Sequence, residues 1–198
     1  MTRLILASGS AARAAMLRSA GVSFLVEPAD VDESGIKERM RQQRATPDQI
    51  AVALAQAKAL QISERNSGAY VIGADQVLIH QAVLYDKPTT MSEAREHLRK
   101  LRGETHHLIS AVAIWENGKE IWSACGYADL TMRAFSDAFL DQYLEKFGRG
   151  ALTSVGAYHL EGLGAQLFSD VKGDYFTILG MPLLEVLGFL RSRGILAS

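Results

Sequence analysis

The segment Ser8-Gly9-Ser10-Ala11-Ala12-Arg13 has the residue types of an anion-binding loop. It follows the apolar run Leu4–Ala7 and opens a stretch rich in Ala, Leu, Met and Arg, which predicts a helix. The first N–H groups of a helix lack internal partners, and the helix dipole attracts negative charge to them. Ser8 and Ser10 can add hydroxyl donors, and Arg13 can bind an oxyanion through its planar guanidinium. The segment therefore predicts a phosphate site, although a Ser-Gly-Ser turn also serves as a plain helix cap.

Two carboxylates are the candidates for holding a metal ion and activating water. Asp75 follows the very apolar run Ala69–Ala74, so the sequence places it at the carboxyl end of a buried strand, where ligand crevices of α/β sheets open. Glu33 lies in a polar segment that we expect to be a loop. Mg²⁺ usually takes one or two carboxylates plus substrate phosphates, and a carboxylate near a metal can act as a base. The plainer interpretations are a strand-end cap for Asp75 and a solvated charge for Glu33.

Two lysines are the candidate phosphate cations. Lys58 lies in the otherwise apolar helical stretch Leu54–Leu60, where a lysine can bind phosphate or only extend its ammonium to solvent. Lys87 precedes Pro88, which keeps it extended, and a surface turn is the alternative interpretation. The sequence contains neither a Gly-x-x-x-x-Gly-Lys-Ser/Thr loop nor a Gly-x-Gly-x-x-Gly after its first strand, so other common nucleotide motifs are excluded.

The composition is that of an ordinary globular chain of 198 residues, 48% hydrophobic and 22% charged. Its formal net charge of -1 provides no global attraction to nucleic acid or to an anionic membrane, so we expect neither as a partner. The single Cys125 cannot form an intramolecular disulfide or a metal cluster. No apolar run approaches the roughly 20 residues of a membrane span, and no secretory signal is present, so we expect a cytoplasmic protein.

Helical and strand-like runs alternate along the chain. Thr46-Pro47-Asp48-Gln49 matches a helix start with a capping box. Long strand-like runs over 105–115 and 120–133 meet at Asn117-Gly118, a strong hairpin signal. We also expect a hairpin around His80-Gln81 and short strands over 158–160, 165–168 and 175–179. This mixture predicts an α/β fold with a mixed central sheet flanked by helices, in a single domain spanning residues 1–198.

Eight segments, taken in order from Leu4 to about Leu187, resemble the Maf family of nucleotide pyrophosphatases, also called septum-formation-inhibitor-like proteins. They are Leu6-Ala7-Ser8-Gly9-Ser10 with Arg13; Val31-Asp32-Glu33; Leu54-Ala55-Gln56-Ala57-Lys58-Ala59; Ile72-Gly73-Ala74-Asp75; Lys87-Pro88; Leu98-Arg99-Lys100-Leu101-Arg102-Gly103 with His106; Gly156-Ala157-Tyr158 with Glu161-Gly162; and Gly180-Met181-Pro182-Leu183. Each segment is weak alone, and their common order and spacing carry the resemblance.

The resemblance implies a two-lobed fold with a cleft, related to inosine-triphosphate pyrophosphatases. It also implies hydrolysis between the α and β phosphates with Mg²⁺ or Mn²⁺. Asp75 falls on the family's proton acceptor and, with Glu33, on its metal-handling positions. The implied phosphate-binding residues are Ser8, Ser10, Arg13, Lys58 and Lys87.

Three further positions bear on the base. A subgroup acting on dTTP and UTP tends to carry Arg, Thr and Gln there, and one acting on 7-methyl-GTP tends to carry Trp, Gln and Glu. This sequence has Ala12, Gln76 and Glu161, so two of three resemble the second type. A carboxylate at Glu161 can accept hydrogen bonds from guanine and complement the charge of a methylated purine. The usual Ser-Pro-Arg-Arg is here Ser10-Ala11-Ala12-Arg13, which lacks the proline and one cation.

The leading hypothesis is a nucleoside triphosphate pyrophosphatase that releases a monophosphate and pyrophosphate, with a house-cleaning role toward modified nucleotides such as 7-methyl-GTP. By resemblance, a homodimer is a plausible assembly. Two alternatives stay open: a nucleotide-binding regulator of cell division without turnover, and a phosphatase on the same scaffold. Pyrophosphate as the product would indicate the first, tight binding without product the second, and orthophosphate the third.

Overall fold

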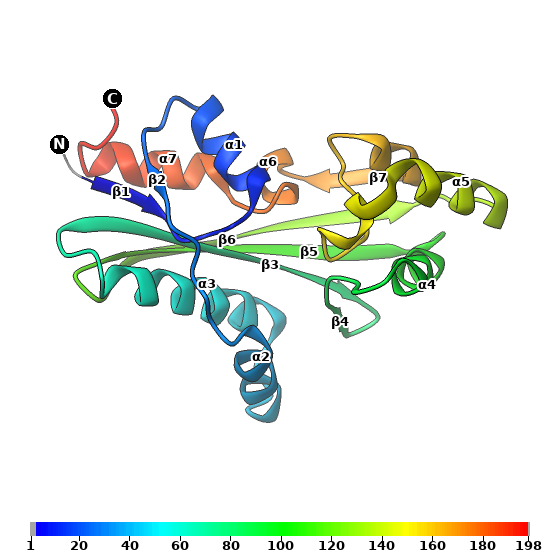
Figure 1. Cartoon of the computed structure of the whole chain (residues 1–198), viewed down its shortest axis with the longest axis horizontal. Helices are drawn as coiled ribbons and strands as arrows, with labels where there is room; N and C mark the ends of the chain where they lie inside the picture. The colour runs from blue at the N-terminus through cyan, green and yellow to red at the C-terminus, as the bar shows by residue number, and fades with distance from the viewer. Residues whose placement is uncertain (1–2, 198) are drawn as a thin grey trace. The chain divides into compact units, whose positions relative to one another are not determined.

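A computed structural model describes residues 3–197 of the chain (Figure 1). The chain forms two compact units. The first consists of Met1–Gln76, Ile109–Gly126 and Asp174–Ser198, and the second of Val77–Leu108 and Tyr127–Gly173. Hydrogen-bonded strands follow the order β2-β1-β3-β5-β6-β7, with β4 paired to β3. Both parallel and antiparallel pairs occur, so the predicted mixed α/β fold is confirmed.

The first unit contains most of the helices. Its elements are β1 (Arg3–Leu6), α1 (Ala11–Ser19), β2 (Leu25–Val26), α2 (Glu33–Gln42), α3 (Pro47–Ser63), α6 (Tyr175–Ile178), α7 (Leu183–Ser192) and parts of β3 (Ala69–His80), β5 (Thr105–Glu116) and β6 (Lys119–Met132). Strand β1 pairs in parallel with both β2 and β3. Helix α3 covers one face of β1 and β3, and α1 and α7 cover the other (Figure 1).

Because helices cover both faces, the strands of this unit are apolar on both sides. Ile5 and Val71 pack with residues of α3, whereas Leu6 and Ile72 pack with residues of α1 and α7. The α3 face also requires a glycine. A Cβ added to Gly73 would overlap the carbonyl oxygen of Ala55 and lie 2.7 Å from the backbone nitrogen of Ala59.

The second unit holds the β3–β4 hairpin and two of the α-helices. It contains β4 (Val83–Tyr85), α4 (Met91–Leu101), α5 (Asp137–Phe147), the 3-10 helices η1 (Gly148–Leu152) and η2 (Leu163–Leu167), β7 (Phe168–Gly173) and the remaining parts of β3, β5 and β6. The predicted hairpin forms: His80 pairs with Val83, and the intervening Gln81 and Ala82 have φ of 49° and 62°.

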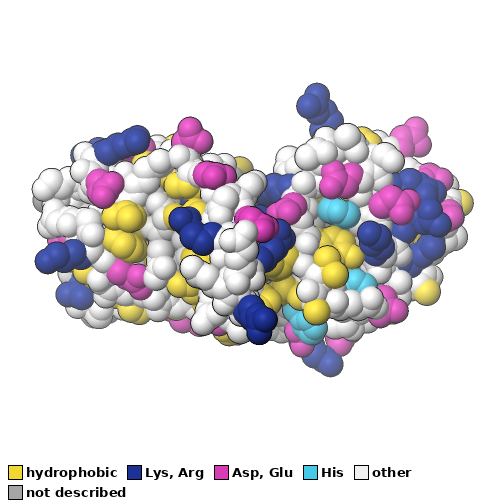
Figure 2. Space-filling model, turned by 90° about the horizontal axis from the view of Figure 1, so that it is seen from below, with side chains coloured by type: hydrophobic (Ala, Val, Ile, Leu, Met, Phe, Trp, Pro, Cys, Tyr) yellow, Lys and Arg dark blue, Asp and Glu magenta, His cyan; other side chains and the backbone are white. Residues whose placement is uncertain are grey.

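On the face shown in Figure 2, acidic and basic side chains are interspersed.

Four local predictions were wrong. The polar segment after Asp32 is helix α2 rather than a loop, because the Asp32 carboxylate accepts from the Gly35 N–H at 2.9 Å and caps it. Residues 158–160 form no strand, and 165–167 belong to η2. The β-prone run 175–179 starts as helix α6, since Asp174 caps the Thr177 N–H at 2.7 Å. No helix among residues 3–197 is both long and apolar enough to cross a membrane.

Candidate active site

The turn between β1 and α1 is a capped helix start. Ser10 is the N-cap of α1, and its hydroxyl oxygen accepts from the Arg13 N–H at 3.4 Å. Ser8 is buried, and its oxygen accepts from the Ser10 N–H at 3.3 Å and from Arg13 Nη1 at 3.1 Å. Both hydrogen bonds use lone pairs of Ser8, so its own proton is left to donate to a ligand. Ser10 therefore caps the helix, and the hydroxyl protons of both Ser8 and Ser10 are left to donate to a ligand.

Arg13 is a buried cation whose guanidinium also joins three segments of the chain by hydrogen bonds. It is only 8% exposed. Its Nε donates to the carbonyl of Gly180 at 2.7 Å, and its Nη1 donates to the carbonyl of Ala74 at 2.9 Å and to Ser8. Two of its three nitrogens are thus engaged with protein, and Nη2 is the one left to serve the predicted phosphate role. The bond to Ala74 also fixes the peptide that leads into Asp75.

Lys58 lies between the two predicted carboxylates. Its Nζ is 2.5 Å from Asp75 Oδ1 and 2.7 Å from Glu33 Oε1. The side chains of Lys58 and Asp75 are about a tenth exposed, whereas that of Glu33 is 44% exposed. Burial lowers the pKa of Arg13, and the charges of Asp75 and Glu33 oppose this effect. The hydrogen bond from Arg13 to the carbonyl of Ala74 places Arg13 beside Asp75.

The position of Asp75 corrects one expectation. Strand β3 does not end there but continues to His80. Strand β1 does end earlier, because its last residue, Leu6, pairs with Ile72. Asp75 consequently lies beyond the carboxyl end of β1, beside the start of α1. The carboxyl end that places Asp75 at an edge of the parallel strands is therefore that of β1, not that of its own strand.

The remaining predicted residues are distributed between the two units. Ala12 is a half-buried residue of α1, and Gln76 follows Asp75 with its side chain hydrogen-bonded to Ser110. Lys87 and Glu161 belong to the second unit, and both are exposed. Their proposed contacts with substrate stay predictions. Sequence reasoning missed Ser110, because a serine within a strand carries no signal of its own.

The donor set suits a hard divalent cation bound together with phosphates. Glu33 and Asp75 are oxygen ligands that already converge on one positive charge, that of Lys58. No group of three His, Cys, Asp or Glu side chains in the described part of the chain is arranged to hold a metal. Mg²⁺ and Mn²⁺ accept one or two carboxylates plus phosphate oxygens, whereas a structural zinc needs four protein ligands. The residues therefore fit the first kind of ion.

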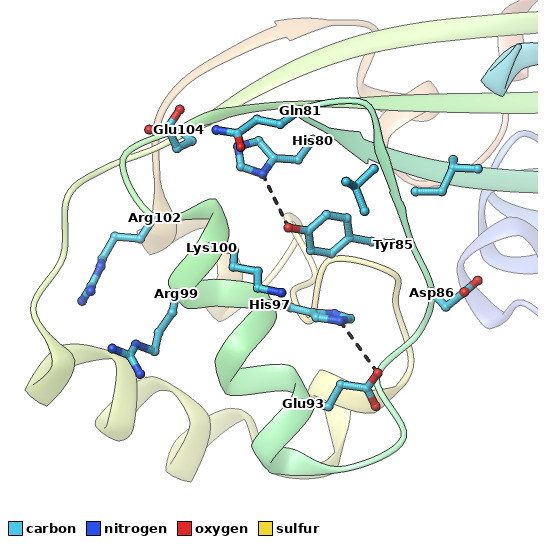
Figure 3. A pocket seen from close by; sticks show the side chains of 12 residues that line it. His80, Gln81, Tyr85, Asp86, Glu93, His97, Arg99, Lys100, Arg102 and Glu104 are labelled. Carbon is cyan, nitrogen blue, oxygen red and sulfur yellow. Dashed lines mark hydrogen bonds and ion pairs between the residues drawn. The ribbon is translucent and has the colours of Figure 1, made fainter.

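A separate hollow of about 710 Å³ lies in the second unit (Figure 3). His80 and Tyr85 approach at 3.5 Å, and the ring of Tyr85 meets His97 edge-on at 4.9 Å. Burial lowers the pKa of His97. The charged residues that line the hollow are balanced, three basic and three acidic: Arg99, Lys100, Arg102, Asp86, Glu93 and Glu104. Such a lining does not favour a triphosphate, and the hollow holds none of the predicted site residues.

Comparison with known proteins shows the family of the chain. The family described as "Maf-like protein" matches residues 3–193. The chain belongs to the Maf family. A protein of Paramagnetospirillum magneticum named nucleoside triphosphate pyrophosphatase is 50% identical over 96% of this chain and 98% of its own length. Nucleoside triphosphate pyrophosphatase 1 of Jannaschia sp. is 45% identical over the whole of both chains. A 7-methyl-GTP pyrophosphatase of Rhizobium meliloti is 46% identical over 96% of each. The names of these relatives of the Maf protein thus give two different substrates, a nucleoside triphosphate and 7-methyl-GTP.

Proposed function

We propose that this Maf protein is a hydrolase that converts a nucleoside triphosphate to a monophosphate and pyrophosphate. The observation that carries the proposal is the convergence of Asp75, Glu33 and Lys58 in one unit with Arg13. Family membership and the names of the relatives support the same reaction. A binding protein without turnover would not need two carboxylates gathered around a lysine beside a helix start.

We assign the following roles. Asp75 accepts a proton from the attacking water as the bond between the α-phosphorus and the bridging oxygen breaks. Ser8 and Arg13 Nη2 donate to phosphate oxygens, and the start of α1 adds its dipole. Arg13 also holds Asp75 in place through the carbonyl of Ala74.

We propose Glu33 and Asp75 as the ligands of Mg²⁺ or Mn²⁺. The ion would supply charge neutralisation for the triphosphate and a lowered pKa for a bound water. Lys58 occupies the space between these carboxylates. Its ammonium would therefore have to turn toward the phosphates when the cation binds, which joins its predicted phosphate role to its observed position.

We propose 7-methyl-GTP as the first modified nucleotide to test. Gln76 and Glu161 are the residues that favour it, and relatives carrying that name support the choice. The same panel should contain GTP, UTP and dTTP. A strong preference for UTP or dTTP would contradict this choice of base without touching the proposed chemistry.

The reaction itself is tested by product analysis. Purified protein with Mg²⁺ or Mn²⁺ should release monophosphate and pyrophosphate in equal amounts. Both products are measured by ³¹P NMR. Orthophosphate as the first product would indicate a phosphatase instead. Tight nucleotide binding with no product from any nucleotide would favour the regulator hypothesis.

A further inference from the structure

The NH₂ group of the Gln76 side-chain amide faces three acceptors, which share its two protons. Its Nε2 lies 3.0 Å from Ser110 Oγ, 3.1 Å from the carbonyl oxygen of Thr177 and 3.0 Å from that of Ile178. The Ser110 hydroxyl donates its proton to the Thr177 carbonyl at 2.7 Å, so its oxygen is left to accept from Gln76. A reversed amide would set its oxygen against two carbonyl oxygens. Only the NH₂ group therefore fits at this end.

The frame that holds this amide is rigid. Ser110 is fully buried in β5, and Thr177 is 2% exposed. Asp174 caps α6 through the Thr177 N–H. A Cβ on Gly126 would overlap the side chain of Thr177, so this glycine in β6 lets α6 pack closely. Neither the hydroxyl nor the carbonyls can move far without disturbing buried contacts.

The other end of the amide is open. Gln76 Oε1 accepts no hydrogen bond from a residue of the described chain, and it is not among the buried side-chain atoms that lack a partner. It belongs to the residue directly after Asp75 in β3. Phosphate oxygens are acceptors as well, so this oxygen cannot bind them. Its complement is a donor, and the nucleotide offers donors on its base and its ribose.

We infer that Ser110 is a positioning residue for base recognition, fixing Gln76 so that its oxygen accepts from an N–H of the base. The inference rests on the proposed function for its ligand, a nucleotide. Guanine carries adjacent donors, N1–H and the 2-amino group. Uracil carries a single N–H flanked on both sides by carbonyl oxygens, which repel the Gln76 oxygen, whereas guanine N1–H has the 2-amino donor on one side. The fixed oxygen consequently favours a guanine-type base over uracil or thymine.

A binding experiment tests this separately from turnover. Dissociation constants for the non-hydrolysable α,β-methylene analogues of GTP and UTP are measured by calorimetry for wild type, Ser110→Ala, Ser110→Thr, Gln76→Met and the Ser110→Ala/Gln76→Met double variant. Wild type should prefer the GTP analogue. Ser110→Ala should reduce that preference roughly fivefold, as expected for one neutral hydrogen bond, and Gln76→Met about tenfold. Ser110→Thr keeps the hydroxyl and should restore the preference.

The double variant distinguishes positioning from a general structural effect. If Ser110 acts through Gln76, adding Ser110→Ala to Gln76→Met changes the preference no further. Additive losses, an unchanged preference in Ser110→Ala, or a wild-type preference for the UTP analogue would each overturn the inference. An equal loss of affinity for the GTP and UTP analogues in Gln76→Met would also overturn it, by assigning the oxygen to the ribose that both analogues share. Failure of the proposed function appears elsewhere, as absence of pyrophosphate from hydrolysable nucleotides.

Discussion

At the scale of single residues, Lys58 links the two chemical tasks of the site. Its ammonium is the shared partner of Asp75 and Glu33, at 2.5 and 2.7 Å, and it is itself almost buried. A divalent cation between the same carboxylates would experience strong repulsion from that charge. Cation binding and the movement of Lys58 toward phosphate are therefore coupled.

This coupling predicts an opposite effect of one substitution on two ligands. Lys58→Met should raise the affinity for Mn²⁺ by roughly tenfold or more, because a nearby like charge is removed from a weakly solvated site. The same variant should bind the triphosphate less tightly and turn over more slowly. Mn²⁺ binding without nucleotide is measured by electron paramagnetic resonance. Lys172→Met, which removes an exposed lysine paired with Asp170 at 3.4 Å, is the matched control. Weaker Mn²⁺ binding in Lys58→Met would contradict the coupling.

The sequence is informative about residue types but not about their partners. Ser8, Arg13, Lys58, Glu33 and Asp75 could be selected from local pattern, and the structure brings them into one unit. The partners of Arg13 could not be predicted. Its bond to the carbonyl of Gly180 joins positions 167 residues apart, and no local pattern reports a contact of that range.

At the scale of elements, the site depends on how closely α3 approaches β3. Lys58 reaches Asp75 because α3 lies directly on Gly73 of the strand, at Ala55 and Ala59. Elements with strong local signals were predicted correctly, as the capping box of α3 and the Asn117-Gly118 hairpin illustrate. The helix α6 was not, because burial and the Asp174 cap override the β-propensity of its sequence.

The close approach predicts a contrast between two glycines. Gly73→Ala should lower the free energy of unfolding by about 2 kcal/mol or more, because the backbone of α3 cannot yield to the added methyl. It should also reduce turnover by displacing Lys58. Gly188 lies exposed in α7, and a methyl group added there would meet no other atom within 4 Å. Gly188→Ala should therefore be neutral or stabilising by up to about 1 kcal/mol. Urea unfolding checks both variants. Equal stability of the two would show that the α3 contact is looser than described.

At the scale of the whole molecule, the two units have different kinds of interior. The first is mainly aliphatic around the strands, whereas the second encloses polar aromatic groups. His106 is fully buried there, and its Nε2 lies 2.7 Å from the hydroxyl of Tyr158. Burial lowers the pKa of His106 to about 3. The folded chain therefore keeps this imidazole neutral where the unfolded chain binds a proton.

The pH dependence of stability follows from that difference. Between pH 6.5 and about 3, the unfolded state binds the extra proton, so stability falls as the pH falls. This group should cost roughly 1.5 kcal/mol between about pH 6.5 and about pH 5. His106→Phe cannot be protonated, so its unfolding free energy should depend less steeply on pH over this interval, whatever its stability at neutral pH. Parallel pH profiles for the two proteins in urea titrations would mean that His106 does not carry this dependence.

The central claim, that one carboxylate beside Lys58 activates water for pyrophosphate release, is tested most directly through Asp75. The measurement is the rate of pyrophosphate release by wild type, Asp75→Asn and the exposed control Asp170→Asn, at saturating nucleotide and Mg²⁺. Asp75→Asn should lower this rate by about 10²–10⁴-fold, the usual contribution of a general base, while Asp170→Asn stays near wild type. A rate for Asp75→Asn within a few-fold of wild type would contradict the claim.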